Sequence, residues 1–237
     1  MKKSILFLFF FAALASVAVG QNANDWFTTL WDLTKPTYRT TNNPATTIAF
    51  YGIGSGYTLY WEDADDPTPP GKHGTVPSVS SNGSISPYYL PVPTGTTKVR
   101  IKVHKGSGTF SAIHFSSYTD LKRLIAVEQW GTTVWSTMIN AFHSCENMDV
   151  TATDVPDLSA CQILGSMFTN CKSLVNVNSS ISDWQTENVT NMSGMFKGAT
   201  SFNQPIGNWN TAKVTSMSYM FSGATSFNKP LNSWNTA

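Results

Sequence analysis

The residue types that carry chemistry in most enzymes are few in this sequence, and they do not form a recognisable catalytic pattern. The four histidines share no metal-ligand spacing; they are His73, His104, His114 and His143. The sequence contains no Gly-x-Ser-x-Gly nucleophile motif and no glycine-rich phosphate loop. It therefore predicts no catalytic residue, no metal site and no cofactor, and we do not expect hydrolase activity.

One acidic run is a candidate cation site. Residues 62–66 read Glu-Asp-Ala-Asp-Asp, and hard cations such as Ca²⁺ prefer several oxygen ligands. The run lacks the spacing of a defined calcium-binding loop. A solvated turn is therefore the favoured interpretation, and a Ca²⁺ site is the alternative.

The three cysteines lie in the second half of the chain. Cys145 and Cys171 occupy the same position of a repeated phrase, and alanine takes that position in two later copies. Neighbouring strands in a stack lie about 4.8 Å apart, within disulfide range, but equivalent side chains in a stack point in parallel. The pattern favours buried thiols over a Cys145–Cys171 disulfide. Cys161 is interpreted as a core residue, because Val189 has its place in the next copy.

Sequence repeats position these side chains. Four phrases align without gaps from Met138 onward: MINAFHSCENM, LGSMFTNCKSL, MSGMFKGATSF and MSYMFSGATSF. Their phenylalanines recur at a nearly constant separation: Phe142, Phe168, Phe196 and Phe221. A tryptophan recurs with the same period, at Trp184, Trp209 and Trp234. Such a period indicates a solenoid, in which each unit buries its apolar face against its neighbours and each aromatic residue stacks on its own kind.

Each phrase predicts a short helix of about two turns. The apolar residues at 192, 195, 196 and 199 follow the spacing of one helical face. An extended segment, a loop and the tryptophan complete the unit. The methionines are interpreted as core residues, because a flexible thioether fills irregular gaps. Residues 138–237 are therefore expected to form a leucine-rich-repeat-like α/β solenoid, so that the fold class of the whole chain is mixed.

Residues 21–115 predict an all-β sandwich. Three runs combine β-branched and aromatic residues, and in residues 98–104 apolar side chains alternate with basic ones. Turn-rich stretches lie between the runs, as is typical of antiparallel sandwiches. Residues 116–137 form a junction, expected to cover the first repeat, whose pattern fits a helix as well as a strand.

The N-terminal segment 1–20 predicts export. Met-Lys-Lys is followed by an apolar stretch too short to span a membrane, and then by small residues before Gln21. We expect a signal peptide at 1–20, a mature chain that begins at Gln21 and no transmembrane segment in it. A retained membrane anchor is the alternative.

Composition narrows the class of partner. Charged residues make up 12% of the chain and the formal net charge is +1. A nucleic-acid-binding protein normally has a basic stripe, and no Lys/Arg cluster stands out here. Nucleic acid is therefore not an expected partner, whereas an extracellular protein or glycan is.

The repeat phrases resemble those of a known family. AFHSCENM and MFTNCKSL resemble the Ala-Phe-x-x-Cys-x-x-Leu phrase of BspA-like leucine-rich repeats in bacterial surface proteins, and residues 188–221 resemble the longer repeat unit of that family. YTLYWEDADD resembles a strand of a polycystic-kidney-disease-type (PKD-like) sandwich, although Tyr60 and Glu62 stand where its pattern has Asp and Gly. The resemblance implies a secreted or cell-surface bacterial protein that acts in adhesion or recognition and has no catalytic residues.

The expected function is thus non-catalytic binding through the repeats. The last two repeats differ at positions expected to face solvent, and solenoids bind partners through such surfaces. The candidate binding residues are Lys197, Gln204, Tyr219 and Lys229.

Two alternatives remain open. The protein is a carbohydrate-binding protein that acts through the sandwich, or it is the non-catalytic N-terminal part of a longer surface enzyme. In the first alternative, the candidate sugar-stacking residues are Tyr57, Tyr60 and Trp61.

The last repeat stops before the KVTSM that follows its predecessor. We expect the natural protein to continue with further repeats, so that the solenoid is truncated here. An uncapped last coil exposes its core. Met217–Ala237 is therefore expected to open in hydrogen exchange before Met138–Trp184.

Overall fold

The structure is a computed structural model that describes residues 23–37, 47–67, 73–82, 87–115, 120–178 and 180–235. The predicted signal peptide at 1–20 and the predicted new N-terminus at Gln21 lie outside the described residues. Export and a retained anchor both stay predictions.

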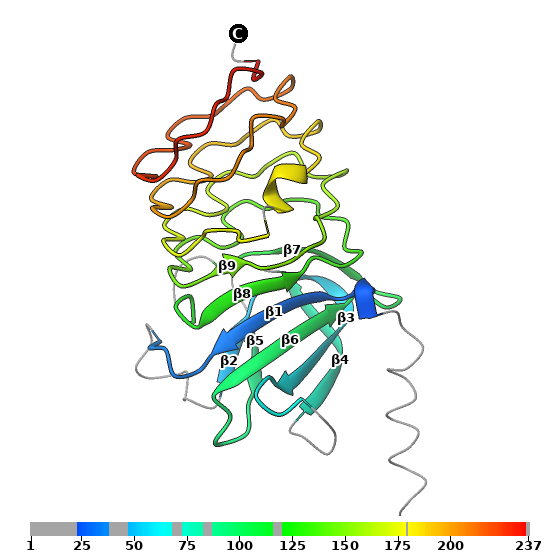
Figure 1. The fold of residues 1–237 in the computed structure, drawn as a ribbon. Helices are drawn as coiled ribbons and strands as arrows, with labels where there is room; N and C mark the ends of the chain where they lie inside the picture. Colours follow the sequence, from blue (N-terminus) through cyan, green and yellow to red (C-terminus); the bar gives the residue numbers. More distant parts are fainter. Residues whose placement is uncertain are drawn as a thin grey trace, which may run out of the picture.

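The described N-terminal half is built on one large sheet and one small one (Figure 1). The large sheet has seven strands, β1 (Phe27–Asp32), β3 (Gly52–Asp63), β4 (His73–Asn82), β6 (Lys98–His104), β7 (Thr109–Ile113), β8 (Leu124–Gln129) and β9 (Asp149–Val150). Its order is β4-β3-β6-β1-β8-β9, and β7 pairs with β3. The small sheet pairs β2 (Thr47–Phe50) with β5 (Tyr88–Pro91). The regular structure described in residues 27–115 is thus all β, as expected, in two sheets of unequal size whose buried residues share one hydrophobic core.

Alternation along β6 sets the two faces of the large sheet. Val99, Ile101 and Val103 are buried, while the basic residues between them are partly exposed, as the sequence predicted. Both neighbours, β1 and β3, pair antiparallel to β6. Successive side chains of a strand point to opposite faces, so the basic residues of β6 share one outer face.

The junction is a strand. Residues 124–129 form β8, which pairs antiparallel with β1 and parallel with β9. Because β9 belongs to the first repeat, the large sheet continues into the repeats. Asp120 and Arg123, a buried ion pair with 3.3 Å between Nη1 and Oδ1, hold the start of the junction against β2. The Asp120 carboxylate accepts the Ala49 N–H, and Arg123 donates to the Thr47 carbonyl.

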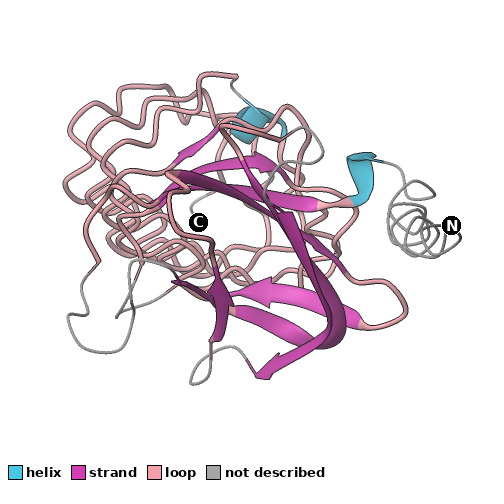
Figure 2. Ribbon diagram, turned by 90° about the horizontal axis from the view of Figure 1, so that it is seen from below, coloured by secondary structure: helices cyan, strands magenta, loops and turns pink. Residues whose placement is uncertain are grey.

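The expected leucine-rich-repeat-like α/β solenoid is wrong, and with it the mixed fold class. The described residues contain no α-helix; the helical segments described are two short 3₁₀ helices, η1 (Ala23–Asp25) and η2 (Ser180–Asp183). The repeats consist of turns and loops arranged in stacked coils, which overlie one another when the molecule is viewed along the stack (Figure 2). Strands are therefore the main regular structure of the described chain, and all of them lie between residues 27 and 150.

Left-handed residues explain why the apolar phrase forms turns. The backbone angle φ lies between 54° and 64° at one position of every coil: Asn140, Ser166, Gly194 and Tyr219. It is also positive at a second position of each coil, at Ser144, Asn170, Gly198 and Gly223. An α-helix requires negative φ at every residue. The helical spacing of the apolar residues therefore predicted correctly which side chains are buried, but it predicted the wrong backbone conformation.

Alternate backbone N–H groups have different partners. The Met195 N–H donates to the Met192 carbonyl within its own coil, whereas the Phe196 N–H donates to the Met220 carbonyl of the next coil at 2.9 Å. The Lys197 N–H again bonds within its coil. A helix would use all of these donors internally. Here every second donor links one coil to the next.

Aromatic columns run through the coils. The centroids of consecutive phenylalanine rings lie 5.6 to 5.9 Å apart and the rings are nearly parallel: Phe142, Phe168, Phe196 and Phe221. The tryptophan rings lie 6.2 and 6.4 Å apart in the same manner: Trp184, Trp209 and Trp234. The predicted stacking of each aromatic residue on its own kind is confirmed. These columns and the buried face of the large sheet form one hydrophobic core.

The last described coil is the least buried. Phe142, Phe168 and Phe196 are fully buried, whereas Phe221 and Trp234 are only partly so. Whether the natural protein continues with further repeats stays a prediction.

Candidate functional site

An exposed lysine–tyrosine pair lies on the repeats. Lys197 Nζ is 5.6 Å from the centroid of the Tyr219 ring, close enough for a cation–π contact. Tyr219 is 73% exposed and has a left-handed backbone. The structure thus brings together two of the four predicted binding residues, which lie in neighbouring coils.

Tyr219 is unusual for its position. The preceding coils place Asn140, Ser166 and Gly194 there; all three are small, and glycine and asparagine are the types that adopt a left-handed backbone most readily. A bulky residue in this conformation costs about 1–2 kcal/mol. Local stability therefore does not explain the tyrosine.

The other two predicted residues occupy equivalent places in the two last coils. Gln204 is half-buried, and its side-chain amide donates to the Val175 carbonyl of the preceding coil at 2.6 Å. Lys229, at the same position of the following coil, is also half-buried. Gln204 therefore contributes to the packing between coils as well as to the surface.

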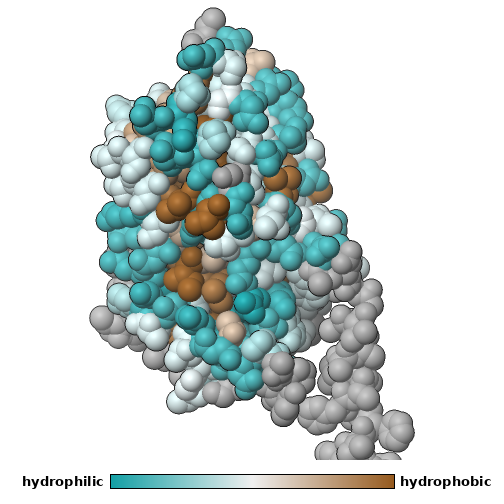
Figure 3. Space-filling model, viewed as in Figure 1, coloured by the Kyte–Doolittle hydropathy of each residue, from teal (hydrophilic) through white to brown (hydrophobic). Residues whose placement is uncertain are grey.

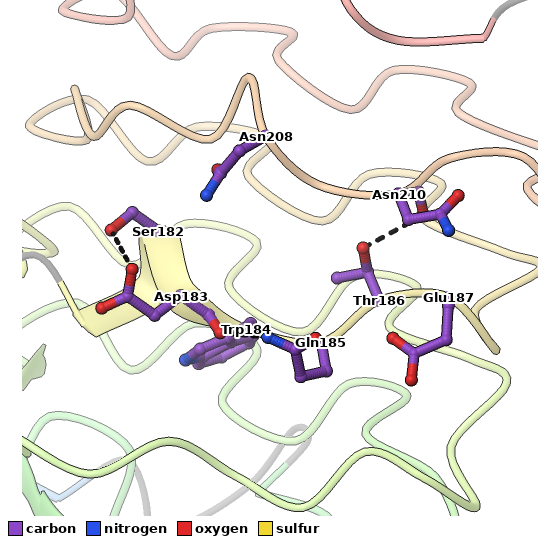
Figure 4. Close-up of a pocket in the computed structure, with 8 residues that line it drawn as sticks. All are labelled: Ser182, Asp183, Trp184, Gln185, Thr186, Glu187, Asn208 and Asn210. Carbon is purple, nitrogen blue, oxygen red and sulfur yellow. Dashed lines mark hydrogen bonds between the residues drawn. The ribbon is translucent and has the colours of Figure 1, made fainter.

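A polar pocket of about 430 Å³ opens between two coils (Figure 4). It is lined by Ser182, Asp183, Trp184, Gln185, Thr186, Glu187, Asn208 and Asn210. The Thr186 hydroxyl donates to the Asn210 carbonyl at 3.1 Å and joins the two coils. The Asn208 side chain projects from the upper coil toward the lower one.

The lining offers many hydrogen-bonding groups. Asp183 and Glu187 are exposed carboxylates, and three side-chain amides provide both donors and acceptors. Trp184 is 2% exposed, and its indole N–H has no hydrogen-bond partner among the described residues. The equivalent indole of Trp209 bonds to the Ile181 carbonyl. The pocket is therefore suited to bind a small polar group.

Apolar side chains on the repeat surface are scattered. Val177 and Val175 are 66% and 41% exposed. In the face shown in Figure 3, hydrophobic colour is confined to small groups within a mostly hydrophilic surface. The recognition chemistry visible on this face is therefore mainly polar.

The predicted sugar-stacking residues differ in how far they are buried. Tyr57 is fully buried against Phe110, with ring centroids 5.2 Å apart, and Trp61 is 8% exposed beneath Gly74. Neither ring face is open to a sugar. Tyr60 points to the opposite face of β3 and is half-exposed. Alternation along the strand therefore leaves one of the three as a candidate.

The acidic run at 62–66 ends β3 and continues into bends. Glu62 is buried and accepts from Arg100 at 2.9 Å, while Asp63 accepts the Asp65 N–H at 3.1 Å. Among the described residues, no group of three His, Cys, Asp or Glu side chains is placed to hold a metal ion. The first two residues of the run therefore belong to β3 and are buried, and only residues 64–66 fit the predicted solvated turn.

A family model described as "Mycoplasma protein of unknown function, DUF285" matches residues 119–237. The chain belongs to the DUF285 family. The matched region contains most of the junction and all four repeats, so the Lys197–Tyr219 pair and the polar pocket both lie in the DUF285 part. No curated protein and no solved structure gave a significant match.

The three cysteines of the DUF285 part are buried free thiols. The Cys171 thiol donates to the Phe142 carbonyl at 3.1 Å. Burial raises the pKa of the Cys145 and Cys171 thiols, which keeps them protonated and unreactive. Cys145 and Cys171 are therefore the buried thiols that the sequence favoured, and not the alternative disulfide.

No helix in the described part of the chain is long and apolar enough to cross a membrane.

Two features of the structure were not predicted from the sequence. One is the polar pocket, whose two segments lie about one repeat apart. The other is a group of aromatic and histidine rings around Tyr60 on the outer face of the large sheet, with Trp26 and His104 as its nearest members. The alternation in residues 98–104 placed His104 on that face, but the strand order that brings Trp26 beside it had no sequence signal.

Proposed function

We propose that this DUF285 protein is a secreted or cell-surface bacterial adhesion protein that binds an extracellular protein or glycan through its repeats, without catalysis. The resemblance of its phrases to BspA-like repeats, and of β3 to a PKD-like strand, supports an extracellular role. The observation that carries the proposal is Tyr219, a strained and exposed aromatic residue next to Lys197.

Strain at an exposed aromatic residue suggests selection for contact rather than for stability. Strained backbone conformations concentrate at binding sites, and tyrosine is among the residues that dominate the energy of interfaces. Tyr219 projects from a coil whose own core is packed against the preceding one. A partner would therefore meet a preorganised ring and cation, with little entropy to lose on binding.

The polar pocket adds a second point of contact on the same stack. Asp183 and Glu187 can accept hydrogen bonds from a partner, and Asn208 can donate as well as accept. Extended contact along several coils is the usual binding mode of stacked repeats.

The test uses the secreted chain and an immobilised panel of extracellular-matrix proteins and glycans. Tyr219→Ser and Lys197→Thr replace each residue by the type found in an earlier coil, at Ser166 and Thr169. Val177→Thr, on an exposed valine of the same stack, is the matched control.

We expect at least one panel member to bind, with affinity at least tenfold weaker for Tyr219→Ser and for Lys197→Thr, and unchanged for Val177→Thr. The unfolding midpoints of the two site variants should equal or exceed that of the parent chain. If every panel member that binds the parent chain binds both site variants equally well, or if no panel member binds, the proposal is overturned.

A further inference from the structure

The outer face of the large sheet carries a compact group of rings. Trp26 lies 5.1 Å from His104 and 6.4 Å from Tyr60, and Tyr60 lies 6.1 Å from His73, all between ring centroids. Lys102 Nζ lies 5.5 Å from the centroid of the Tyr60 ring. We call these five residues the outer-face cluster.

Strand register explains why they meet. Tyr60 pairs with Lys102 and with Thr75, so the three side chains form one row across β4, β3 and β6. Thr58 pairs with His104 in the next row. His73 is exposed and the other cluster members are half-exposed. The rings therefore lie at the surface, on the face opposite the core.

The charges beneath the rings are compensated. The Glu62 carboxylate accepts from Arg100 at 2.9 Å and from Lys102 at 3.1 Å, and Arg100 also pairs with Glu128 at 2.5 Å. These ion pairs leave no large excess of either sign next to the rings. A polyanion or a strongly charged peptide would find little electrostatic attraction here.

Hydrogen-bonding groups surround the rings. The Gly106 N–H donates to His104 Nδ1 at 3.0 Å, so the neutral imidazole carries its proton on Nε2 and can donate from there. The hydroxyl of Tyr60, the ammonium of Lys102 and the hydroxyl of exposed Thr75 lie on the same face. The cluster thus combines aromatic surface with donors and acceptors at its edges.

We propose that the outer-face cluster is a binding site for a neutral glycan. A sugar ring has an apolar C–H face that packs on an aromatic ring and a periphery of hydroxyls that need donors and acceptors. Trp26 and Tyr60 are inclined by 67°. They form a corner rather than a flat platform, which suits one or two sugar units of a soluble oligosaccharide rather than the flat surface of a crystalline polysaccharide.

This inference goes beyond the proposed function, because it concerns another ligand class on another part of the molecule. The two proposals fail separately. Substitutions at Tyr219 and Lys197 should leave glycan binding at the sheet unchanged, and substitutions at Trp26 and Tyr60 should leave binding through the repeats unchanged.

The experiment is isothermal titration of the full secreted chain with four neutral hexasaccharides: cellohexaose, chitohexaose, maltohexaose and mannohexaose. Trp26→Ala and Tyr60→Ala remove one ring each, and Tyr60→Phe keeps the ring without its hydroxyl. Tyr89→Ala is the matched control, because Tyr89 is a 42% exposed tyrosine on β5 outside the cluster.

We expect at least one hexasaccharide to bind, with affinity at least tenfold weaker for Trp26→Ala and Tyr60→Ala. Tyr60→Phe should lose much less, and Tyr89→Ala should bind like the parent chain. Thermal unfolding identifies any variant that fails to fold, and the Tyr60→Phe and Tyr60→Ala pair then decides the question. Binding to none of the four sugars, equal loss in Tyr89→Ala, or binding to proteins or anionic glycans alone would overturn the proposal.

Discussion

The large sheet and the repeats both bury apolar side chains in one hydrophobic core, but they differ in how their hydrogen-bonded segments are spaced along the sequence. In the sheet, paired residues stand far apart in sequence and at irregular separations, as in the pairing of Phe27 with Val103. In the repeats, each coil bonds to the next at a nearly constant separation, as Phe196 does to Met220. Regular spacing makes the repeat core visible in the sequence, whereas the sheet core depends on strand order.

The two regions also expose different chemistry. A strand presents alternate side chains on opposite faces, so the sheet buries Trp61 and leaves Tyr60 outside. A coil turns its phenylalanines and tryptophans inward and leaves a polar surface, on which Tyr219 is the most exposed large hydrophobic residue among those that the structure describes. The sheet therefore offers a group of inclined rings on its outer face, and the repeats offer one ring among polar groups.

The largest effect is expected from the phenylalanine column. Phe168→Ala removes a fully buried ring that stacks on rings above and below it, and we expect a loss of about 3–5 kcal/mol in the free energy of unfolding. Phe221→Ala, in the same column but only partly buried, should cost clearly less. Urea unfolding of both variants checks this, and equal losses would contradict the packing described.

A smaller effect is expected where the coils require a left-handed residue. Gly198 has φ of 67°, and a Cβ there would collide with the Asn170 side chain. Gly198→Ala should cost about 1–2 kcal/mol from the backbone alone, with the collision added. In the turn between β6 and β7, Gly106 also has positive φ but open space around it. Gly106→Ala should show the backbone cost only, and a larger loss there than at Gly198 would contradict the comparison.

The opposite sign is expected at Tyr219. Tyr219→Gly relieves the left-handed strain and restores the residue type of Gly194. We expect the chain to gain up to about 1 kcal/mol in stability while binding through the repeats weakens. Chemical unfolding and the binding assay together check this trade, and a clear loss of stability would show that Tyr219 is structural.

The smallest effect is expected in the pH dependence of stability. Burial, with a contribution from the Lys197 charge, lowers the pKa of His143. The unfolded chain therefore binds the proton first, and stability falls as the pH drops below about 6.5 toward the lower pKa of the folded state. His143→Gln should flatten this fall between pH 7.5 and 5, measured by urea unfolding. If the free energy of unfolding falls with pH as steeply in His143→Gln as in the parent chain, His143 is not the source of the pH dependence.

The repeat period and the identity of the core columns could be predicted, because each coil repeats its apolar residues at fixed positions. The backbone conformation of the coils could not be predicted. Asn140 and Ser166 have a left-handed φ, but neither is a glycine, the residue type that would have indicated it. The hydrogen-bond acceptor of every second backbone N–H also lies one coil away, and the period of the apolar residues does not predict this pairing. The junction was ambiguous because its strand character depends on pairing with β1.

The positions of the candidate binding residues were predictable to a similar degree. Lys197 and Tyr219 were singled out because the last two repeats differ there, and the stacking of coils brings them into contact. The inward orientation of Tyr57 and Trp61 was not predicted, although strict alternation along the strand favours Tyr60 as the outward residue. Register shifts in β3 near Tyr57 weaken the alternating pattern there. Trp26 was missed because its contacts arise only from strand order.

The central claim is that the sheet and the repeats share one core beneath two kinds of surface, and residue-resolved amide hydrogen exchange tests it most directly. β8 and β9 join the two regions, and the hydrophobic core runs through both. The account predicts that the amides of Leu30 in β1 and of Phe168 in the repeats exchange with the same free energy of opening, equal to that of global unfolding. Opening of Phe168 at a markedly lower free energy than Leu30 would contradict the claim and show that the repeats unfold as a separate unit.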